Sequence, residues 1–357
     1  MSLWRRFYVV NVGNERSFDF VCFESGEVSH GVTWRFLGPC LPAWLLQGRV
    51  PQCKRKRMLS GILAGLAAGA LWGLVFVAPR MIPMGVGGYS SVDLAAGRFA
   101  VYGLVSAAVM LLGLGRRRWP TARQAVAALG MSVLGFSGYY LLLVLAIRDA
   151  GTEMPSLIIG TIPLWIMLLG KPTDLRWAAL LPGLALTLAG LLLMMGATHD
   201  AGTGVGLHFW RGIGFALMAL VSWTVFAILN SAWLKRHPEI NATDWANWLG
   251  LATGLGALLM WLSSGSDVQV LAARDDASRF ALLCLVAGLG STWLATILWN
   301  MASQRLSASL CGQLIVSETL FALLYSFVWD GRWPTSIQLC ACVLFMLGIL
   351  ASIRAHR

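Results

Sequence analysis

The hydrophobic residues of this chain gather in blocks of about 20, each long enough to cross the hydrocarbon core of a bilayer as an α-helix. They make up 57% of the 357 residues, whereas only 12% are charged. A soluble domain carries about twice that charged fraction. The pattern therefore predicts an all-α integral membrane protein.

Ten such blocks follow one another from Met58 onward, separated by short polar connections that make neighbouring helices antiparallel. The predicted spans are 59–78, 91–114, 124–147, 154–170, 177–197, 210–234, 243–264, 279–303, 307–329 and 335–353. Residues 1–57 contain no comparable block. We predict for them a disordered tail, or a misassigned segment ahead of a natural start at Met58, where an uninterrupted first helix begins.

The net charge of +11 invites a nucleic-acid interpretation, but the basic residues lie between the apolar blocks. Lys and Arg are sparse in one alternate set of connections, where only Arg80, Arg148, Arg211, Arg274, Arg279 and Arg332 occur. They are dense in the other set, which includes both ends of the predicted bundle. Because cytoplasmic loops carry the excess of Lys and Arg, we predict a multi-pass inner-membrane protein with both termini in the cytoplasm.

The chain also contains an internal repeat. A shift of 151 residues lays Gly61–Val77 on Gly212–Ile228 and places Trp72 on Trp223. Slightly longer shifts, of 155 and 158 residues, bring the third to fifth spans onto the eighth to tenth. The predicted organisation is therefore two related five-helix halves, 58–205 and 206–357.

An odd number of spans in each half means that the second half enters the membrane in the opposite orientation. Inverted repeats of this kind characterise secondary transporters, in which two halves rock around a central site. A duplication kept for stability alone is the alternative.

Three short motifs accompany this organisation: Ala70–Gly73 in the first span, Arg98–Phe99 in the second and Ile162–Leu164 in the fourth. In this order and spacing the chain resembles the EamA-type drug/metabolite transporter superfamily from residue 58 to 354. The resemblance implies a central cavity lined by helices 1–4 and 6–9, and peripheral fifth and tenth helices that could form a homodimer. It also implies export of amino acids, other metabolites or toxic compounds. One departure is Glu318, where such proteins often have Pro at the position matching Pro163.

Glu318 is the leading candidate for chemistry. It lies about 16 Å inside the ninth span, too deep for a short carboxylate to reach the headgroups. An ionised carboxylate without a partner is costly at that depth, so Glu318 should face protein or water. The functional interpretation is a proton-coupling or cation-binding site, and a structural hydrogen bond between helices is the alternative.

Arg98 is a second candidate, because a charged residue within a span is a functional hypothesis by default. It could bind substrate or pair with Glu318, or extend to the outer interface. Tyr102, one turn further on, could line the same wall. The other candidates for the substrate and coupling site are Trp72, Trp223, Tyr139, Asn300 and Gln313.

Other residues have a structural interpretation alongside a functional one. Pro155 and Pro163 interrupt the fourth span and could provide a helix hinge near the site. Gly61, Gly65, Gly69 and Gly73 recur on one face of the first span, where another backbone could approach closely. Asp93 and Asp244 have the spacing of helix caps, and a gating role is the alternative.

These patterns predict a transporter of a small molecule by alternating access, with export coupled to protons. No nucleotide-binding or hydrolase motif is present, so we expect no enzyme activity, no cofactor and no metal. A membrane-embedded enzyme or sensor subunit is the alternative function.

Overall fold

The computed structural model describes residues 21–28, 31–39, 49–84, 87–113, 119–151, 153–196, 207–331 and 333–356. It divides into two compact units, Met1–Leu59 and Ser60–Arg357. In the first unit, strands β1 (Val21–Val28) and β2 (Gly31–Pro39) pair as an antiparallel hairpin. The sequence predicts no regular structure there. Such a hairpin pairs only neighbouring residues, so it requires none of the long apolar blocks on which our prediction was based.

Helix α2 (Arg49–Gly73) begins in the first unit and ends in the second. The second unit continues with η1 (Leu74–Phe76), η2 (Ala78–Met81), α3 (Ser91–Leu112), α4 (Ala122–Ser132), η3 (Val133–Ser137), α5 (Gly138–Ala150), α6 (Glu153–Gly160), α7 (Ile162–Leu169), α8 (Trp177–Gly196) and α9 (Leu207–Arg236). It ends with α10 (Ala242–Ser264), α11 (Val268–Ala272), α12 (Ala277–Val286), η4 (Ala287–Leu294), α13 (Ala295–Arg305), α14 (Ala308–Asp330) and α15 (Ser336–Ala355).

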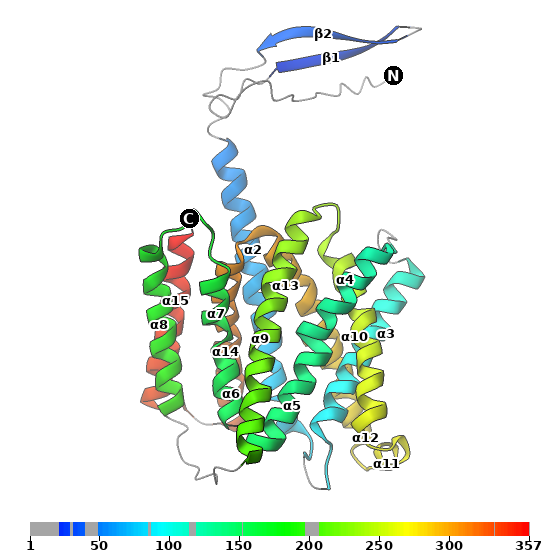
Figure 1. Ribbon diagram of the computed structural model, residues 1–357, viewed down its shortest axis with the longest axis vertical. Coiled ribbons are helices and arrows are strands. Elements are labelled where there is room, and N and C mark those ends of the chain that lie inside the picture. Colours follow the sequence, from blue (N-terminus) through cyan, green and yellow to red (C-terminus); the bar gives the residue numbers. More distant parts are fainter. Residues whose placement is uncertain are drawn as a thin grey trace. The chain divides into compact units, whose positions relative to one another are not determined.

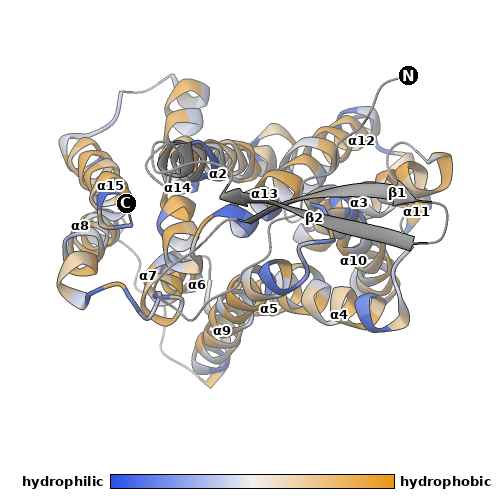
Figure 2. Cartoon of the chain, turned by 90° about the horizontal axis from the view of Figure 1, so that it is seen from above, coloured by the Kyte–Doolittle hydropathy of each residue, from blue (hydrophilic) through white to orange (hydrophobic). Residues whose placement is uncertain are grey.

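Among the described residues, 7 helical segments are long and apolar enough to cross a membrane. They are α3, α4 to α5, α9, α10, α12 to α13, α14 and α15. Met154–Leu169 and Trp177–Leu193 are shorter apolar helices. The prediction of an all-α, multi-spanning membrane region is confirmed in this form, and hydrophobic residues recur along the helices (Figure 2).

The first predicted span is not one uninterrupted α-helix. Helix α2 ends at Gly73, and the chain continues through two short 3₁₀ segments, η1 and η2. Pro79, at the start of η2, has no N–H to donate to the carbonyl of Val75, so an α-helix could not continue through it unbroken. Our prediction ended the span at Ala78, before this proline, but kept it α-helical to that point, which was wrong.

The helices of the second unit pack in a small number of strong pairs. Helix α3 packs on α10, α5 on α9, α7 on α14 and α8 on α15. The α8–α15 pair lies at one edge of the bundle and joins the rest through α7 and α14 (Figure 1). This position matches the peripheral fifth and tenth helices that the family resemblance implies.

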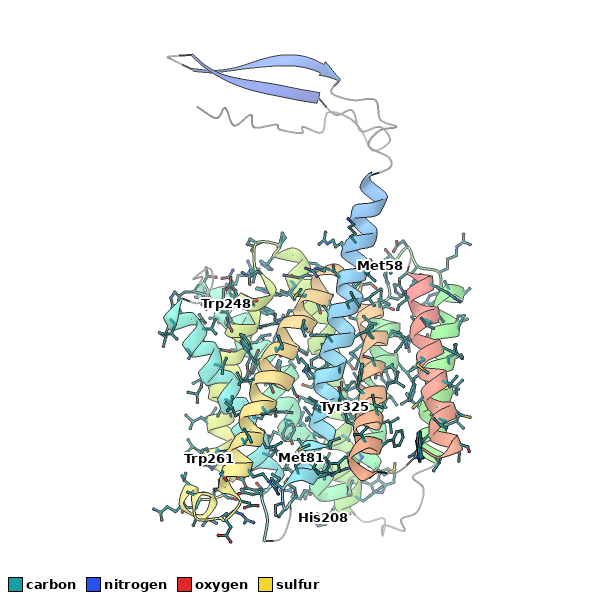
Figure 3. The ribbon with its side chains drawn as sticks, turned by 180° about the vertical axis from the view of Figure 1, so that it is seen from behind. Met58, Met81, His208, Trp248, Trp261 and Tyr325 are labelled. Atoms are coloured by element: carbon teal, nitrogen blue, oxygen red, sulfur yellow. The ribbon has the colours of Figure 1, made fainter. Side chains whose placement is uncertain are left out.

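The two ends of the bundle can be named from residues of α10. Trp248 lies toward one end of the bundle, whereas Trp261 lies toward the other, together with Met81 and His208 (Figure 3). We refer to them as the Trp248 end and the Trp261 end. Helix α9 starts at the Trp261 end and α10 at the Trp248 end, so these two helices are antiparallel.

Several contacts recur at positions related by the sequence shifts. A Cβ added at Gly61 would lie 3.0 Å from the Cβ of Arg305, and one added at Gly212 would lie 2.6 Å from the Cβ of Ala150. A shift of 151 residues relates Gly61 to Gly212, and a shift of 155 relates Ala150 to Arg305, so the two contacts correspond. A shift of 155 residues likewise lays the π-helical segment η3 on the π-helical segment η4.

Other contacts join a residue to its own counterpart. A Cβ added at Gly103 would lie 2.7 Å from the Cα of Gly254, so α3 and α10 cross with their backbones almost touching. Trp72 and Trp223, which the same shift of 151 pairs, form an edge-to-face contact with their rings 6.2 Å apart. The repeat in the sequence thus has matching contacts in the bundle.

Candidate functional site

Glu318 lies near the middle of α14, and its side chain is half-buried. Helix α2 crosses α14 at this point. A Cβ added at Gly69 would collide with the Oγ of Ser317 and lie 3.2 Å from the backbone nitrogen of Glu318. The hydroxyl of Tyr325, two turns further along α14, donates to the carbonyl of Ala70 at 3.1 Å. The glycine face of α2 therefore fixes the position of the Glu318 backbone.

Arg98 approaches the same region from α3. Its guanidinium lies 4.7 Å from the ring centre of Phe99 and 5.7 Å from that of Tyr140, and it interacts electrostatically with Glu318. No ion-pair contact joins Arg98 and Glu318 in the described part of the chain, and the Arg98 Nε is buried without a hydrogen-bond acceptor. A permanent cation is thus held by aromatic rings beside a carboxylate that it does not directly contact.

Tyr139 belongs to this cluster, whereas Tyr102 is turned to another helix. Tyr139 is half-buried at the start of α5 and interacts electrostatically with both Glu318 and Arg98. The fully buried Tyr102 hydroxyl donates to the carbonyl of Ala246 at 2.6 Å, which ties α3 to α10. Arg98, Tyr139 and Glu318 therefore form the charged and phenolic part of the candidate site.

A chain of aromatic rings connects this cluster to the centre of the bundle. Trp72 lies 5.4 Å from Trp299 and 6.2 Å from Trp223, and Trp223 lies 6.0 Å from Phe226. The chain continues from Phe226 to Phe136, then to Phe99 and Tyr140, with successive ring centres 5.5, 6.2 and 5.9 Å apart. The sequence repeat singled out Trp72 and Trp223. It gave no reason to select Phe136 or Phe226, which become visible only through packing.

The two amides among the candidates are bound to other helices. Gln313 is fully buried, donates from Nε2 to Thr187 at 2.9 Å and accepts from Ser352 at 3.0 Å, which attaches α14 to the α8–α15 pair. Asn300 accepts from the Nδ2 of Asn230 at 3.0 Å. Asn230 is a buried polar residue that the sequence analysis missed, although an amide within an apolar span was the signal that identified Asn300.

Replacing Gln313 by Leu should weaken the attachment of α8 and α15. The change removes both hydrogen bonds and leaves two hydroxyls without this partner, at a cost of about 1 kcal/mol for each interhelical bond in a membrane protein. Thermal unfolding of the purified protein in detergent measures the loss. Gln269→Leu, at an exposed position on α11, is the control and should unfold like wild type; equal midpoints for the two variants would contradict the prediction.

The fourth apolar segment is divided at Thr161, between α6 and α7. Pro163 lies in the first turn of α7, and Pro155 lies near the start of α6. The Thr161 hydroxyl donates to the carbonyl of Ile158 at 2.7 Å, which satisfies a backbone group beside the break. Ile166, on α7, packs within 2.7 Å of a Cβ added at Gly312 of α14, so the broken segment lies against the helix that contains Glu318.

Asp93 acts as a helix cap, as the spacing predicted. Its carboxylate accepts from the backbone nitrogen of Ser90, whose hydroxyl accepts from the Asp93 nitrogen. Asp93 also accepts from the backbone and hydroxyl of Ser266, at 2.8 and 2.7 Å. At the Trp248 end of the bundle, where α10 begins, Asn241 accepts from the backbone nitrogen of Asp244 at 2.7 Å. The capping box is complete at Ser90 and Asp93, whereas Asn241 caps α10 and donates from its side-chain amide, not its backbone, to the Asp244 carboxylate.

Polar contacts also join connections at the Trp261 end. The hydroxyl of Tyr89 donates to Asp276 at 2.9 Å, and the Arg274 guanidinium lies 3.3 Å from the same carboxylate. Burial raises the pKa of Asp276, but these hydrogen bonds outweigh it and hold the pKa below its usual value. The loop after α10 is thereby fixed to the connection before α3.

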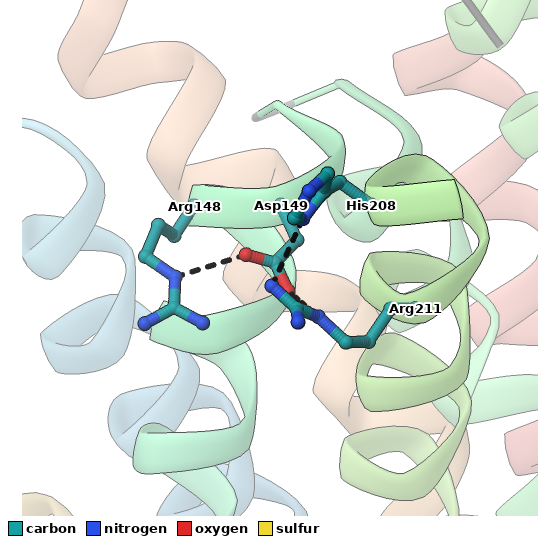
Figure 4. Close-up of polar contacts among 4 residues, drawn as sticks. All are labelled: Arg148, Asp149, His208 and Arg211. Carbon is teal, nitrogen blue, oxygen red and sulfur yellow. Dashed lines mark hydrogen bonds and ion pairs between the residues drawn. The ribbon is translucent and has the colours of Figure 1, made fainter. Parts of the chain in front are cut away.

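A third polar cluster joins α5 to α9 at this end (Figure 4). Asp149 accepts from Arg148 at 2.9 Å and from Arg211 at 2.6 Å, and Arg211 contacts the Nδ1 of His208 at 3.1 Å. The two arginines are about half exposed or more. No group of three His, Cys, Asp or Glu that could hold a metal occurs in the part of the chain that the structure describes.

Residues 210–354 match the model of the EamA-like transporter family. The chain is 31% identical to the inner membrane protein YtfF of Escherichia coli over 312 residues, which cover 84% of this chain and 96% of that protein. It is 23% identical to the uncharacterized transporter YdfC of Bacillus subtilis over 305 residues, covering 83% and 91%. A solved crystal structure aligns with a TM-score of 0.67 at 22% identity, covering 84% of this chain and 98% of that one.

The fold and these similarities define a multi-pass membrane transporter of the inner membrane. The chain belongs to the EamA-like transporter family. Its substrate is accordingly a small molecule, and the resemblance seen in the sequence is confirmed.

Proposed function

We propose that this protein is a secondary transporter that exports a small metabolite, amino acid or drug-like compound in exchange for protons. In this proposal two inverted five-helix halves, 58–205 and 206–357, rock around a central site and expose it to each side of the membrane in turn. In this proposal both termini lie in the cytoplasm, which the excess of Lys and Arg in the connections on that side supports.

The main support for this proposal is that contacts in one half of the chain correspond, through the sequence shifts, to contacts in the other half. Gly103 meets Gly254 and Trp72 meets Trp223, so two residue pairs lie where a two-fold axis between the halves would pass. The Gly61 contact with α13 and the Gly212 contact with α5 would exchange about that axis. Two halves related in this way can adopt two mirrored arrangements, which alternating access requires.

The composition of the site supports proton coupling. Arg98 and Tyr139 come from the first half and Glu318 comes from the second, so their spacing changes if the halves rock. Glu318 is the proposed proton carrier, and Arg98 and Tyr139 contact the substrate or the carboxylate. Trp72 and Trp223 provide aromatic walls. Tyr102, Asn300 and Gln313 support the walls from neighbouring helices, and the break between Pro155 and Pro163 allows the fourth segment to bend.

Proton exchange can be measured in inside-out vesicles from cells that overproduce the protein. We expect that a compound that the protein exports will enter these vesicles and release protons, which collapses an imposed pH gradient reported by a fluorescent dye. Compounds that accumulate outside overproducing cells, together with a panel of amino acids, organic amines and dyes, provide the candidates. Vesicles without the protein are the control.

The same measurement separates transport from the alternative functions. A membrane-embedded enzyme or sensor subunit would change neither the vesicle pH nor the external metabolites in a compound-dependent way. If no compound collapses the gradient and no metabolite accumulates outside the cells, the proposal of a proton-coupled exporter is wrong.

A further inference from the structure

The Trp248 end of the bundle contains a network of buried amides. The Nδ2 of Asn230 donates to the Oδ1 of Asn300 at 3.0 Å, and the indole nitrogen of Trp245 donates to the Oδ1 of Asn230 at 2.7 Å. All three side chains are fully buried. Trp245 also packs 6.0 Å from Trp248, which places the network at this end. The Asn230–Asn300 bond directly joins α9 to α13.

Further hydrogen bonds join α9, α13 and the start of α10 in the same region, which we call the seam. The Nδ2 of Asn300 donates to the carbonyl of Ala242 at 3.4 Å, and the Nε2 of Gln304 donates to the carbonyl of Ile240 at 2.9 Å. The hydroxyl of Ser231 donates to the carbonyl of Ser303 at 3.4 Å. The end of α9, the end of α13 and the start of α10 are thus tied together by polar contacts.

This seam lies directly beside the candidate site. Asn300 follows Trp299, whose ring lies 5.4 Å from Trp72 and 6.2 Å from Trp223. Asn230 lies two turns beyond Trp223 on α9. A molecule that passed between the aromatic rings and the Trp248 end would therefore meet the amide pair next.

The described residues that the shifts relate to this network do not form an equivalent one. The sequence shifts place Asn230 on Pro79, Asn300 on Leu145 and Trp245 on Leu94, none of which has a side-chain amide or indole. The shifts relate α9 and α13 to the first span and α5, so the amide pair of the second half has no counterpart at the related positions of the first. At the Trp261 end, the ion pairs of Asp149 join a different pair of helices, α5 and α9.

We infer that the Asn230–Asn300 pair is a gate, which separates the site from the Trp248 end when closed and opens when α9 and α13 move apart. This inference rests on the alternating access of the proposed function. Amides suit such a gate because they exchange their mutual hydrogen bond for bonds to water at small net cost. Opening an apolar contact of the same size would expose surface that water does not compensate.

Cys311 provides a reporter of the gate that requires no knowledge of the substrate. It is fully buried on α14, two turns from Glu318, and its thiol lies in the neighbourhood of Lys235 on α9 and Ser303 on α13. In a variant that keeps Cys311 as its single cysteine, we expect slow labelling by a membrane-impermeant maleimide. Asn230→Ala or Asn300→Ala leaves the remaining amide without its partner in the closed state, and should speed labelling roughly tenfold.

The maleimide should reach Cys311 from one side of the membrane only, which is tested with right-side-out and inside-out vesicles. Asn247→Ala is the matched control, because its buried amide accepts from Trp293 at 2.9 Å and joins α10 to η4, not α9 to α13. Labelling of Asn247→Ala should remain at the wild-type rate. Equal rates for the Asn230, Asn300 and Asn247 variants would overturn the gate.

A cross-link tests whether α9 and α13 must separate at this position. In a cysteine-free background, Asn230→Cys with Asn300→Cys should be joined by a short bifunctional methanethiosulfonate, which forms a disulfide with each thiol and stops transport until these disulfides are reduced. Continued transport by the linked protein would refute the gate. The maleimide result does not depend on a transport measurement: if Cys311 labelling responds to the Asn230 change but no compound is moved, the proposed function fails, whereas control of access to Cys311 by the amide pair is retained.

Discussion

Glu318→Gln is expected to reduce pH-gradient-driven transport to the background of vesicles that lack the protein, while membrane insertion stays normal. Glutamine keeps the size and the hydrogen-bonding capacity of the side chain but cannot take up or release a proton. If Glu318 carries the proton, exchange between substrate and proton ends with this change. The measurement is the collapse of an imposed pH gradient in inside-out vesicles, with the protein content of each preparation matched.

Glu239→Gln is the control for this prediction, since it makes the same chemical change at an exposed residue in the turn between α9 and α10. It should transport at the wild-type rate. Substrate exchange without a pH gradient should survive in Glu318→Gln if the carboxylate serves only coupling, and should be lost if it also binds the substrate. Wild-type proton-driven transport by Glu318→Gln would eliminate Glu318 as the coupling residue.

The sequence predicted the parts of the fold that depend on local physical constraints. Apolar blocks of about 20 residues marked most of the spans, because the bilayer thickness sets that length. The capping positions of Ser90 and Asn241 were predictable from spacing alone, since the side chain caps a backbone nitrogen only three residues away. The repeat also identified Trp72 and Trp223 as a pair before their rings were seen in contact.

Contacts between distant segments could not be predicted in this way. Gln313 was identified as an amide that needs partners, but its partners Thr187 and Ser352 lie 126 and 39 residues away and on different helices. Departures of the backbone from α-helical geometry could not be predicted from the sequence either. The π-helical segments η3 and η4 contain no proline and carry no distinct sequence signal. They coincide at the shift of 155 residues, which becomes apparent only when both are observed.

The two charged residues of the site lie on different helices, α3 and α14. Glu318 was identified because a carboxylate is rare in a span, and Arg98 for the same reason. That they interact depends on the crossings of α2, α3, α5 and α14, which no single helix specifies. The glycines of α2 are the clearest link between sequence and this geometry, because they set how closely α2 approaches α14.

Gly69→Leu is therefore expected to prevent normal assembly of the bundle. The new Cβ would collide with the Ser317 hydroxyl and press on the Glu318 backbone, and the rest of the side chain would have to enter the same contact. Overpacking of this kind costs about 1–3 kcal/mol or more, depending on how far the helices can separate. Fluorescence-detected size-exclusion chromatography should show a large loss of the monodisperse protein.

Gly130→Leu, on α4, is the matched control, because a Cβ there meets nothing within 4 Å and the residue is exposed. It should yield as much folded protein as wild type. The smaller change Gly69→Ala should impair the protein in part and be rescued by Ser317→Ala, since removing the hydroxyl frees the space that the Cβ needs. Wild-type yield and thermal stability in Gly69→Leu would mean that α2 does not lie against α14 at this position. The support that we assign to the Glu318 backbone would then have to come from another helix.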